Sequence, residues 1–184
     1  MDNKNCCFSG HRVIPPEKLD YIKRRLNIEI VWLAAHGYET FYSGGALGFD
    51  LLAGRAVLNL RDQGTRLKLI MAIPCPGQDK NYPSWDRAEY RRQLAQADET
   101  ILLSEHYYHG CMLARDRFMV DNCSYCICWK TQDKGGTAYT VNYANKSGLS
   151  VTNLAEPKPN DGDLGVDFKE DKAPETDIEE LESE

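Results

Sequence analysis

Short apolar runs alternate along this chain with longer segments in which apolar residues recur every three or four positions. Such runs are typical of strands, and the longer periodicity is typical of helices with one buried face. Strands are predicted over residues 5–8, 39–42, 67–73, 99–103, 125–129 and 149–153. Helices are predicted from Pro16 to His36 and over residues 51–61, 84–97, 111–122 and 136–146. This alternation predicts an α/β fold, a doubly wound parallel sheet flanked by helices on both faces.

The same pattern predicts where a ligand would bind. Residues 67–73 are apolar without interruption, as a strand covered on both faces requires, so we place this strand at the centre of the sheet. Ser84 is expected to cap the helix that begins there. Ligands of open parallel sheets bind at the carboxyl ends of the strands. The loops expected at that edge are residues 9–12, 43–50, 74–85, 105–111 and 130–137.

Charge divides the chain into two parts. Residues 155–184 hold twelve acidic and three basic side chains, a net charge of -9. The net charge of the whole chain is -6. Residues 1–154 therefore hold 16 acidic and 19 basic side chains, a balance of +3. We predict one ligand-binding domain over residues 1–154 and an acidic, disordered tail over residues 155–184. A balance of +3 is too small to favour nucleic-acid binding.

Composition also indicates the size of the core and the expected cellular compartment. The 184 residues are 42% hydrophobic, which is enough for a single globular core. No apolar run approaches the length of a membrane span, and the first residues lack a signal-peptide pattern, so a cytoplasmic protein is expected. Seven scattered cysteines are expected to be reduced, buried thiols. Their spacing does not favour a metal site.

The first glycine turn, residues 43–50, follows a predicted strand and opens a predicted helix. It reads Ser43-Gly44-Gly45-Ala46-Leu47-Gly48-Phe49-Asp50. Glycines allow a sharp turn and close approach of a ligand, and the helix that follows offers unpaired N–H groups to an anion. Asp50 lies in the first turn of that helix, where it could cap the helix or accept hydrogen bonds from a ribose. A plain packing turn is the alternative.

Two further loops carry candidate groups at the same edge. Ser9-Gly10-His11-Arg12 combines a hydroxyl, an imidazole and a guanidinium, which could bind phosphate or transfer a proton, or could simply be exposed loop residues. Lys134-Gly135-Gly136-Thr137, the second glycine turn, again places glycines between a strand and a helix. Together the turns suggest a cleft lined by backbone N–H groups from two helix starts.

Arg115 lies within an apolar helix, where a cation needs a carboxylate or a ligand anion as its partner. An internal ion pair with Asp50 or Asp121 is the alternative to ligand binding. Four side chains could wall the cleft with an aromatic face, or could pack internally: Gln78, Tyr82, Trp85 and Tyr90.

Taken together, these segments resemble the YpsA-like branch of the SLOG superfamily. The resemblance covers residues 5–153 and rests on residues 8–12, 43–50, 115–121 and 135–137, with Gln78 and Trp85. It implies a Rossmann-like fold, a nucleotide or nucleotide-derived ligand and a homodimer. The superfamily includes the DNA-processing protein DprA and the LOG phosphoribohydrolases. LOG enzymes follow their second glycine turn with glutamates, one of them catalytic, whereas this chain has Ala138, Tyr139 and Thr140.

We therefore predict binding of a phosphorylated nucleotide-like ligand, such as a nucleotide or ADP-ribose, by a sensor or an enzyme of unknown reaction, with no bound cofactor. One alternative is LOG-like N-glycosidic hydrolysis of a nucleoside monophosphate; another is a DprA-like regulatory or DNA-processing interaction. The catalytic candidates are Arg115, Asp50 and His11. The predicted ligand contacts are Ser9, Gly10, His11, Arg12, Ser43, Gly44, Gly45, Gly48, Asp50, Gln78, Arg115, Gly135, Gly136 and Thr137.

Overall fold

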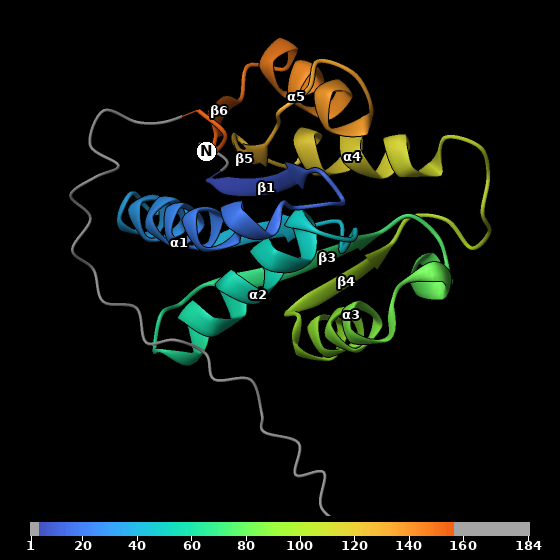
Figure 1. The fold of residues 1–184 in the computed structure, drawn as a ribbon, viewed down its shortest axis with the longest axis horizontal. Coiled ribbons are helices and arrows are strands. Elements are labelled where there is room, and N and C mark those ends of the chain that lie inside the picture. The colour runs from blue at the N-terminus through green and yellow to red at the C-terminus, as the bar shows by residue number, and fades with distance from the viewer. Residues whose placement is uncertain (1–3, 157–184) are drawn as a thin grey trace, which may run out of the picture.

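Six parallel strands form one twisted sheet in the computed structural model, which describes residues 4–156 (Figure 1). Their order across the sheet is β4-β3-β2-β1-β5-β6. The predicted tail lies outside the described residues except for Ala155 and Glu156. The strands are β1 Asn5–Gly10, β2 Thr40–Ser43, β3 Lys68–Ile73, β4 Glu99–Leu102, β5 Tyr125–Trp129 and β6 Ser150–Asn153.

Helices connect these strands and cover both faces of the sheet, as Figure 1 shows. They are α1 Leu19–Ala35, α2 Phe49–Asp62, α3 Ser84–Gln96, α4 Cys111–Asp121 and α5 Gly136–Lys146, with short 3-10 helices η1 Pro16–Lys18 and η2 Gln78–Asn81. The doubly wound, Rossmann-like α/β fold predicted from the sequence is confirmed.

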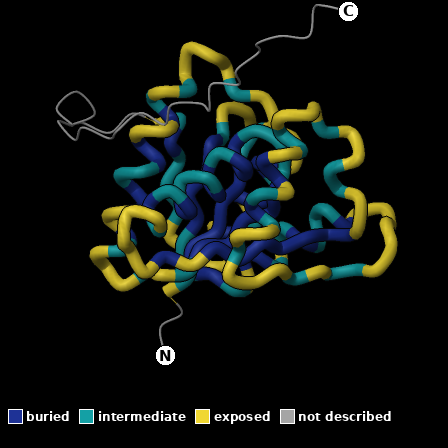
Figure 2. Tube along the Cα trace, turned by 90° about the horizontal axis from the view of Figure 1, so that it is seen from below, coloured by how far each residue is buried: buried dark blue, intermediate teal, exposed yellow. Residues whose placement is uncertain are grey.

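Side chains that alternate along each strand build two separate cores. Cys6 and Phe8 of β1 pack with α1, α2 and Tyr90 of α3, whereas Cys7 between them packs with α4 and α5. This two-sided burial explains the unbroken apolar runs, because both faces of a parallel sheet are covered. Figure 2 shows the buried segments at the centre of the molecule.

The apolar stripe of α1 lies in the first core as its spacing predicts. Ile22, Leu26, Ile30 and Leu33 are fully buried. Burial of each such side chain contributes roughly 1.5 to 3 kcal/mol. The helix ends at Ala35, and Gly37 follows with a positive φ of 88°, as expected of a glycine just beyond a helix.

Two predictions about single elements are wrong. The strand β3 is not central: it lies between β2 and the edge strand β4, while β2 and β1 occupy the middle. Its apolar run reflects coverage on both faces rather than a central position. Ser84 is the first residue of α3 and not its cap; Pro83 holds the N-cap position, and no side chain caps this helix.

All seven cysteines are buried, free thiols, as expected. Across residues 4–156, no helix is both long enough and apolar enough to cross a membrane.

Candidate functional site

The carboxyl ends of three neighbouring strands bring the predicted loops together. Strand β1 pairs with β2 on one side and with β5 on the other. Residues 9–12, at the carboxyl end of β1, therefore lie between the first glycine turn, at the end of β2, and the second glycine turn, which follows β5. The strand order reverses between β1 and β5, which is where open α/β sheets bind their ligands.

The first glycine turn is packed against the protein's own groups. A Cβ on Gly44 would collide with the guanidinium of Arg115, and one on Gly48 would collide with the backbone of Arg12. The N–H of Phe49 at the start of α2 donates to the carbonyl of His11 at 3.2 Å. Glycine is therefore required here for internal close packing.

The amides of this turn also have internal acceptors. Ser43 Oγ accepts the N–H of Gly45 at 3.1 Å and donates to the carbonyl of Asp50 at 3.2 Å. The Asp50 carboxylate accepts hydrogen bonds from the amides of Ala46 and Gly44. A carboxylate from the protein itself thus occupies the position that the sequence suggested for an anionic ligand.

Asp50 titrates unusually because it is buried. Only 5% of the residue is exposed, and desolvation raises the pKa of Asp50 to about 7. Arg115 opposes this shift, Asp116 adds to it, and the two amide hydrogen bonds oppose it. The pKa of Arg115 is itself raised: desolvation lowers it, but the charges of Asp116 and Asp50 outweigh that effect.

Arg115 connects α4 to the first glycine turn. Its guanidinium is buried, Nη1 donates to the carbonyl of Gly44, and Nε donates to Asp116 Oδ1 at 2.7 Å. The predicted internal ion pair is therefore present, but its contact partner is Asp116. Asp50 interacts with Arg115 only as a nearby charge, and Asp121 instead accepts a hydrogen bond from Tyr143.

Asp116 extends this network to the second glycine turn. Thr140 Oγ1 lies 3.1 Å from Asp116 Oδ2 and 2.9 Å from the carbonyl of Gly136. A continuous polar chain therefore links Gly44, Arg115, Asp116, Thr140 and Gly136. The sequence did not predict the roles of Asp116 and Thr140. The feature that could have indicated them is the position of Thr140, one helical turn after Gly136 on the same face of the helix.

The residues proposed as an aromatic wall support the first turn or pack elsewhere. Gln78 Nε2 donates to the carbonyl of Gly44 at 2.8 Å, and the Tyr82 hydroxyl donates to the carbonyl of Gly45 at 3.0 Å. Tyr90 is buried in the core, whereas Trp85 is 62% exposed, with the guanidinium of Arg55 over its ring. The packing alternative describes these side chains better than an aromatic cleft does.

The second glycine turn, in contrast, is open. A Cβ on Gly135 or Gly136 would meet no atom within 4 Å, and both residues are exposed. No side chain caps α5, so its first amides have no side-chain acceptor within the described residues. Lys134 is exposed beside them, while the side chain of Thr137 is 9% exposed.

The loop after β1 borders this open turn. His11 Nε2 accepts the N–H of Thr131 at 3.0 Å, which joins the loops that follow β1 and β5. Burial lowers the pKa of His11, so a neutral ring with its proton on Nδ1 fits this hydrogen bond. Arg12 is exposed, whereas Ser9 is buried and Gly10 packs against Phe49.

Within residues 4–156, no three His, Cys, Asp or Glu side chains are grouped so as to hold a metal ion. The polar surface at the open turn offers instead the first backbone amides of α5 and the exposed cation of Lys134. Such a surface is suited to an anion, because helix N-termini and basic side chains both stabilise negative charge.

Comparison with known proteins agrees with the fold. DNA processing protein A from Streptococcus pneumoniae superposes with a TM-score of 0.58 at 20% identity, over 80% of this chain and 48% of that chain. The Helicobacter pylori protein of the same name, solved to describe its single-stranded DNA binding mode, gives a TM-score of 0.58 at 25% identity, over 80% and 63%. The chain thus spans less than two thirds of either solved protein.

The sheet order, with the glycine turns at its switch point, defines a Rossmann-like domain. A family model described as the YspA SLOG family (YpsA) matches residues 15–153, and the chain belongs to this family. The uncharacterized SPbeta prophage-derived protein YoqJ of Bacillus subtilis is 31% identical over 121 residues, which are 59% of this chain and 71% of YoqJ.

Proposed function

We propose that this protein binds a nucleotide or a nucleotide-derived ligand, with a phosphate of the ligand at the start of α5. The observation that carries the proposal is the contrast between the two glycine turns. The amides of the first turn face Asp50 and Ser43, whereas the start of α5 has no side-chain cap and is open next to the exposed Lys134. Gly135, Gly136 and Thr137 are thus the proposed phosphate contacts.

The other predicted contacts take supporting roles in this proposal. Gln78 and Arg115 hold the carbonyl of Gly44, and the His11 ring bridges two loops. Ser43, Gly45, Gly48 and Asp50 shape the first turn, Gly10 lets the end of β1 approach Phe49 closely, and Ser9 is buried. In this proposal, all of these residues position the rim of the site and do not contact the phosphate.

Isothermal titration with AMP, ADP-ribose and NAD tests the proposal on the full chain. Saturable heat with at least one of these ligands supports it. A folded protein that gives no heat with any of them contradicts it. Light scattering of the same samples tests the predicted homodimer.

N-glycosidic hydrolysis is less well supported than binding. The Asp50 carboxylate faces the amides of its own turn, and the side chains that follow the second glycine turn include no carboxylate at Ala138, Tyr139 or Thr140. Incubation with nucleoside monophosphates, followed by chromatography for free base, decides between the two. Release of base that is lost in Arg115→Ala would favour hydrolysis.

A DprA-like interaction with DNA is the second alternative. The Helicobacter pylori structure describes single-stranded DNA binding, so the prediction that nucleic acid is not a ligand has no support from this likeness. A single-stranded oligonucleotide therefore belongs in the titration panel. Binding of the oligonucleotide without binding of any mononucleotide would favour this alternative.

A further inference from the structure

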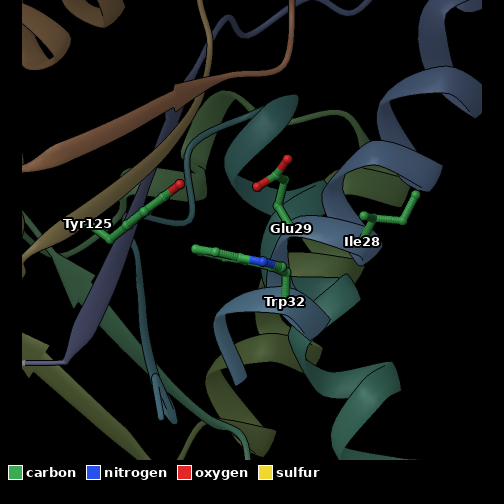
Figure 3. A pocket seen from close by; sticks show the side chains of 4 residues that line it. All are labelled: Ile28, Glu29, Trp32 and Tyr125. Atoms are coloured by element: carbon green, nitrogen blue, oxygen red, sulfur yellow. The ribbon is translucent and has the colours of Figure 1, made fainter. Parts of the chain in front are cut away.

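A shallow hollow lies between α1 and the beginning of β5, away from the glycine turns. It has a volume of about 120 Å³ and is lined by Ile28, Glu29, Trp32 and Tyr125 (Figure 3). Tyr125 is the first residue of β5, and Trp32 lies in the last turn of α1. The hollow is therefore at the amino edge of the sheet, opposite the proposed phosphate site.

The lining combines two aromatic rings with a buried carboxylate. The centroids of Trp32 and Tyr125 are 6.5 Å apart, and Trp32 is 49% exposed. Glu29 is only 2% exposed and lies 3.9 Å from Arg25 in an ion pair along α1. Aromatic grooves bind proline-rich segments, and a carboxylate beside aromatic faces attracts a cation. The chemistry that fits is a proline-rich segment that carries a lysine or an arginine.

The chain itself supplies such a segment close to the hollow. Leu154 is buried in the core beneath α1, and the carbonyl of Glu156 accepts a hydrogen bond from Arg25 Nη1 at 3.3 Å. The sequence then continues Pro157-Lys158-Pro159-Asn160. Prolines restrict themselves and the residues before them to extended conformations, which reduces the entropy lost on docking.

The length of the segment also matches the distance along α1 from Arg25 to the hollow. Along α1, Arg25 and Trp32 are separated by about 10 Å, since each helical residue rises about 1.5 Å. An extended proline-rich segment advances about 3.1 Å per residue, so roughly three to four residues cover that distance. A segment that starts at Arg25 therefore reaches Trp32 at about residue 160.

We propose that residues 157–160 dock along α1 into this hollow, with the Lys158 ammonium at Glu29 and the proline rings against Trp32 and Tyr125. Docking holds the acidic remainder of the chain, residues 161–184, at the amino edge. Its carboxylates then do not compete with an anion at the start of α5. The docking itself does not depend on the proposed function; only its consequence for the start of α5 does.

Disulfide trapping in the full chain tests the docking. Ile28→Cys combined with Asn160→Cys keeps both prolines and both aromatic rings, and the seven native thiols are buried. Lys23→Cys with Asn160→Cys is the matched control, because Lys23 is exposed on α1 but lies far from Trp32 and does not line the hollow. We expect an intramolecular disulfide to form about tenfold faster in the first pair, as a docked segment raises the effective thiol concentration. Equal rates, no disulfide, or disulfide-linked dimers would overturn the proposal.

A second measurement requires no engineered cysteine. Asp-N protease should cleave the unmodified chain more slowly before Asp161 than before Asp177, because docking shields residues next to the hollow. Trp32→Ala should remove this difference, whereas Trp85→Ala, which changes an exposed tryptophan elsewhere, should preserve it. Equal cleavage at both sites in the unmodified chain would rule out docking.

Discussion

The guanidinium of Arg115 occupies the space that a side chain on Gly44 would need, and Nη1 donates to the Gly44 carbonyl. This contact joins α4 to the loop after β2, two segments that are 71 residues apart. The space beside the Gly44 Cα is thus filled by Arg115. The anion-binding surface is instead assigned to the start of α5.

Gly44→Ala should destabilise the protein. The new methyl group would force Arg115 away from the Gly44 carbonyl, and such overpacking costs typically about 1 to 3 kcal/mol. Urea unfolding followed by circular dichroism measures the change. Gly136→Ala is the control, since its Cβ meets no atom within 4 Å, and it should leave the midpoint unchanged or slightly raised. Equal midpoints for wild type and Gly44→Ala would contradict the packing argument.

Asp116→Asn should lower the pKa of Asp50. The negative charge of Asp116 raises that pKa, so its removal makes ionisation of Asp50 easier while the side-chain shape is kept. Carboxyl-detected NMR titration of the variant and the wild type measures the shift. A pKa that stays the same or rises would show that the two carboxylates are not electrostatically coupled.

Asp50 should make stability depend on pH. Its pKa is raised in the folded state to about 7 from the usual value of 3.8, so the folded protein binds the proton more tightly than the unfolded chain. This contribution is complete below pH 3.8 and is lost as the pH rises to about 7. The expected slope is roughly 1.4 kcal/mol per pH unit within that window.

Asp50→Asn removes the titrating group and should flatten the decline in the free energy of unfolding across this window. The exposed Asp62 provides the control: Asp62→Asn should retain the decline. Urea unfolding at a series of pH values measures both. An unchanged slope in Asp50→Asn would mean that another group causes the dependence.

Thr140→Val should weaken the connection between the two glycine turns. The substitution keeps the shape but removes the hydroxyl next to Asp116 Oδ2 and the Gly136 carbonyl. Loss of a partner for a buried polar group costs about 1 to 3 kcal/mol. Thermal unfolding measures the loss, and Thr100→Val on the exposed edge strand should change stability by less than about 0.5 kcal/mol. Similar effects of the two substitutions would argue against the network.

The sequence predicted the elements well because their signals are local. Periodicity located every α-helix and every strand of the described residues, and glycines located both turns, but the short helix η2 was expected to be a loop. The sequence could not predict the position of β3 in the sheet. An apolar run indicates that helices cover both faces of a strand, but it does not indicate the order of the strands. Ser84 resembled a cap by residue type, but the helix starts one residue earlier than a cap at that position would allow.

The partners within the site depended on tertiary contacts that no local pattern reports. Arg115 was expected to pair with a carboxylate such as Asp50 or Asp121, but in the structure it pairs with the adjacent Asp116. The contact between Asp116 and Thr140 joins residues 24 positions apart on two helices. Likewise, the sequence showed two similar glycine turns, and only the structure showed that one is filled by Asp50 and the other is open.

The central claim, an anion site at the start of α5, is tested most directly by titrating ADP-ribose into wild type, Gly136→Asp and Ser84→Asp. Aspartate at position 136 places a carboxylate where the phosphate is proposed to bind, while aspartate at position 84 adds the same charge to the uncapped start of α3. We predict that wild type and Ser84→Asp bind alike and that Gly136→Asp binds at least about tenfold more weakly, a loss of about 1.4 kcal/mol. Equal affinity in all three proteins, or no binding by folded wild type, would contradict the account.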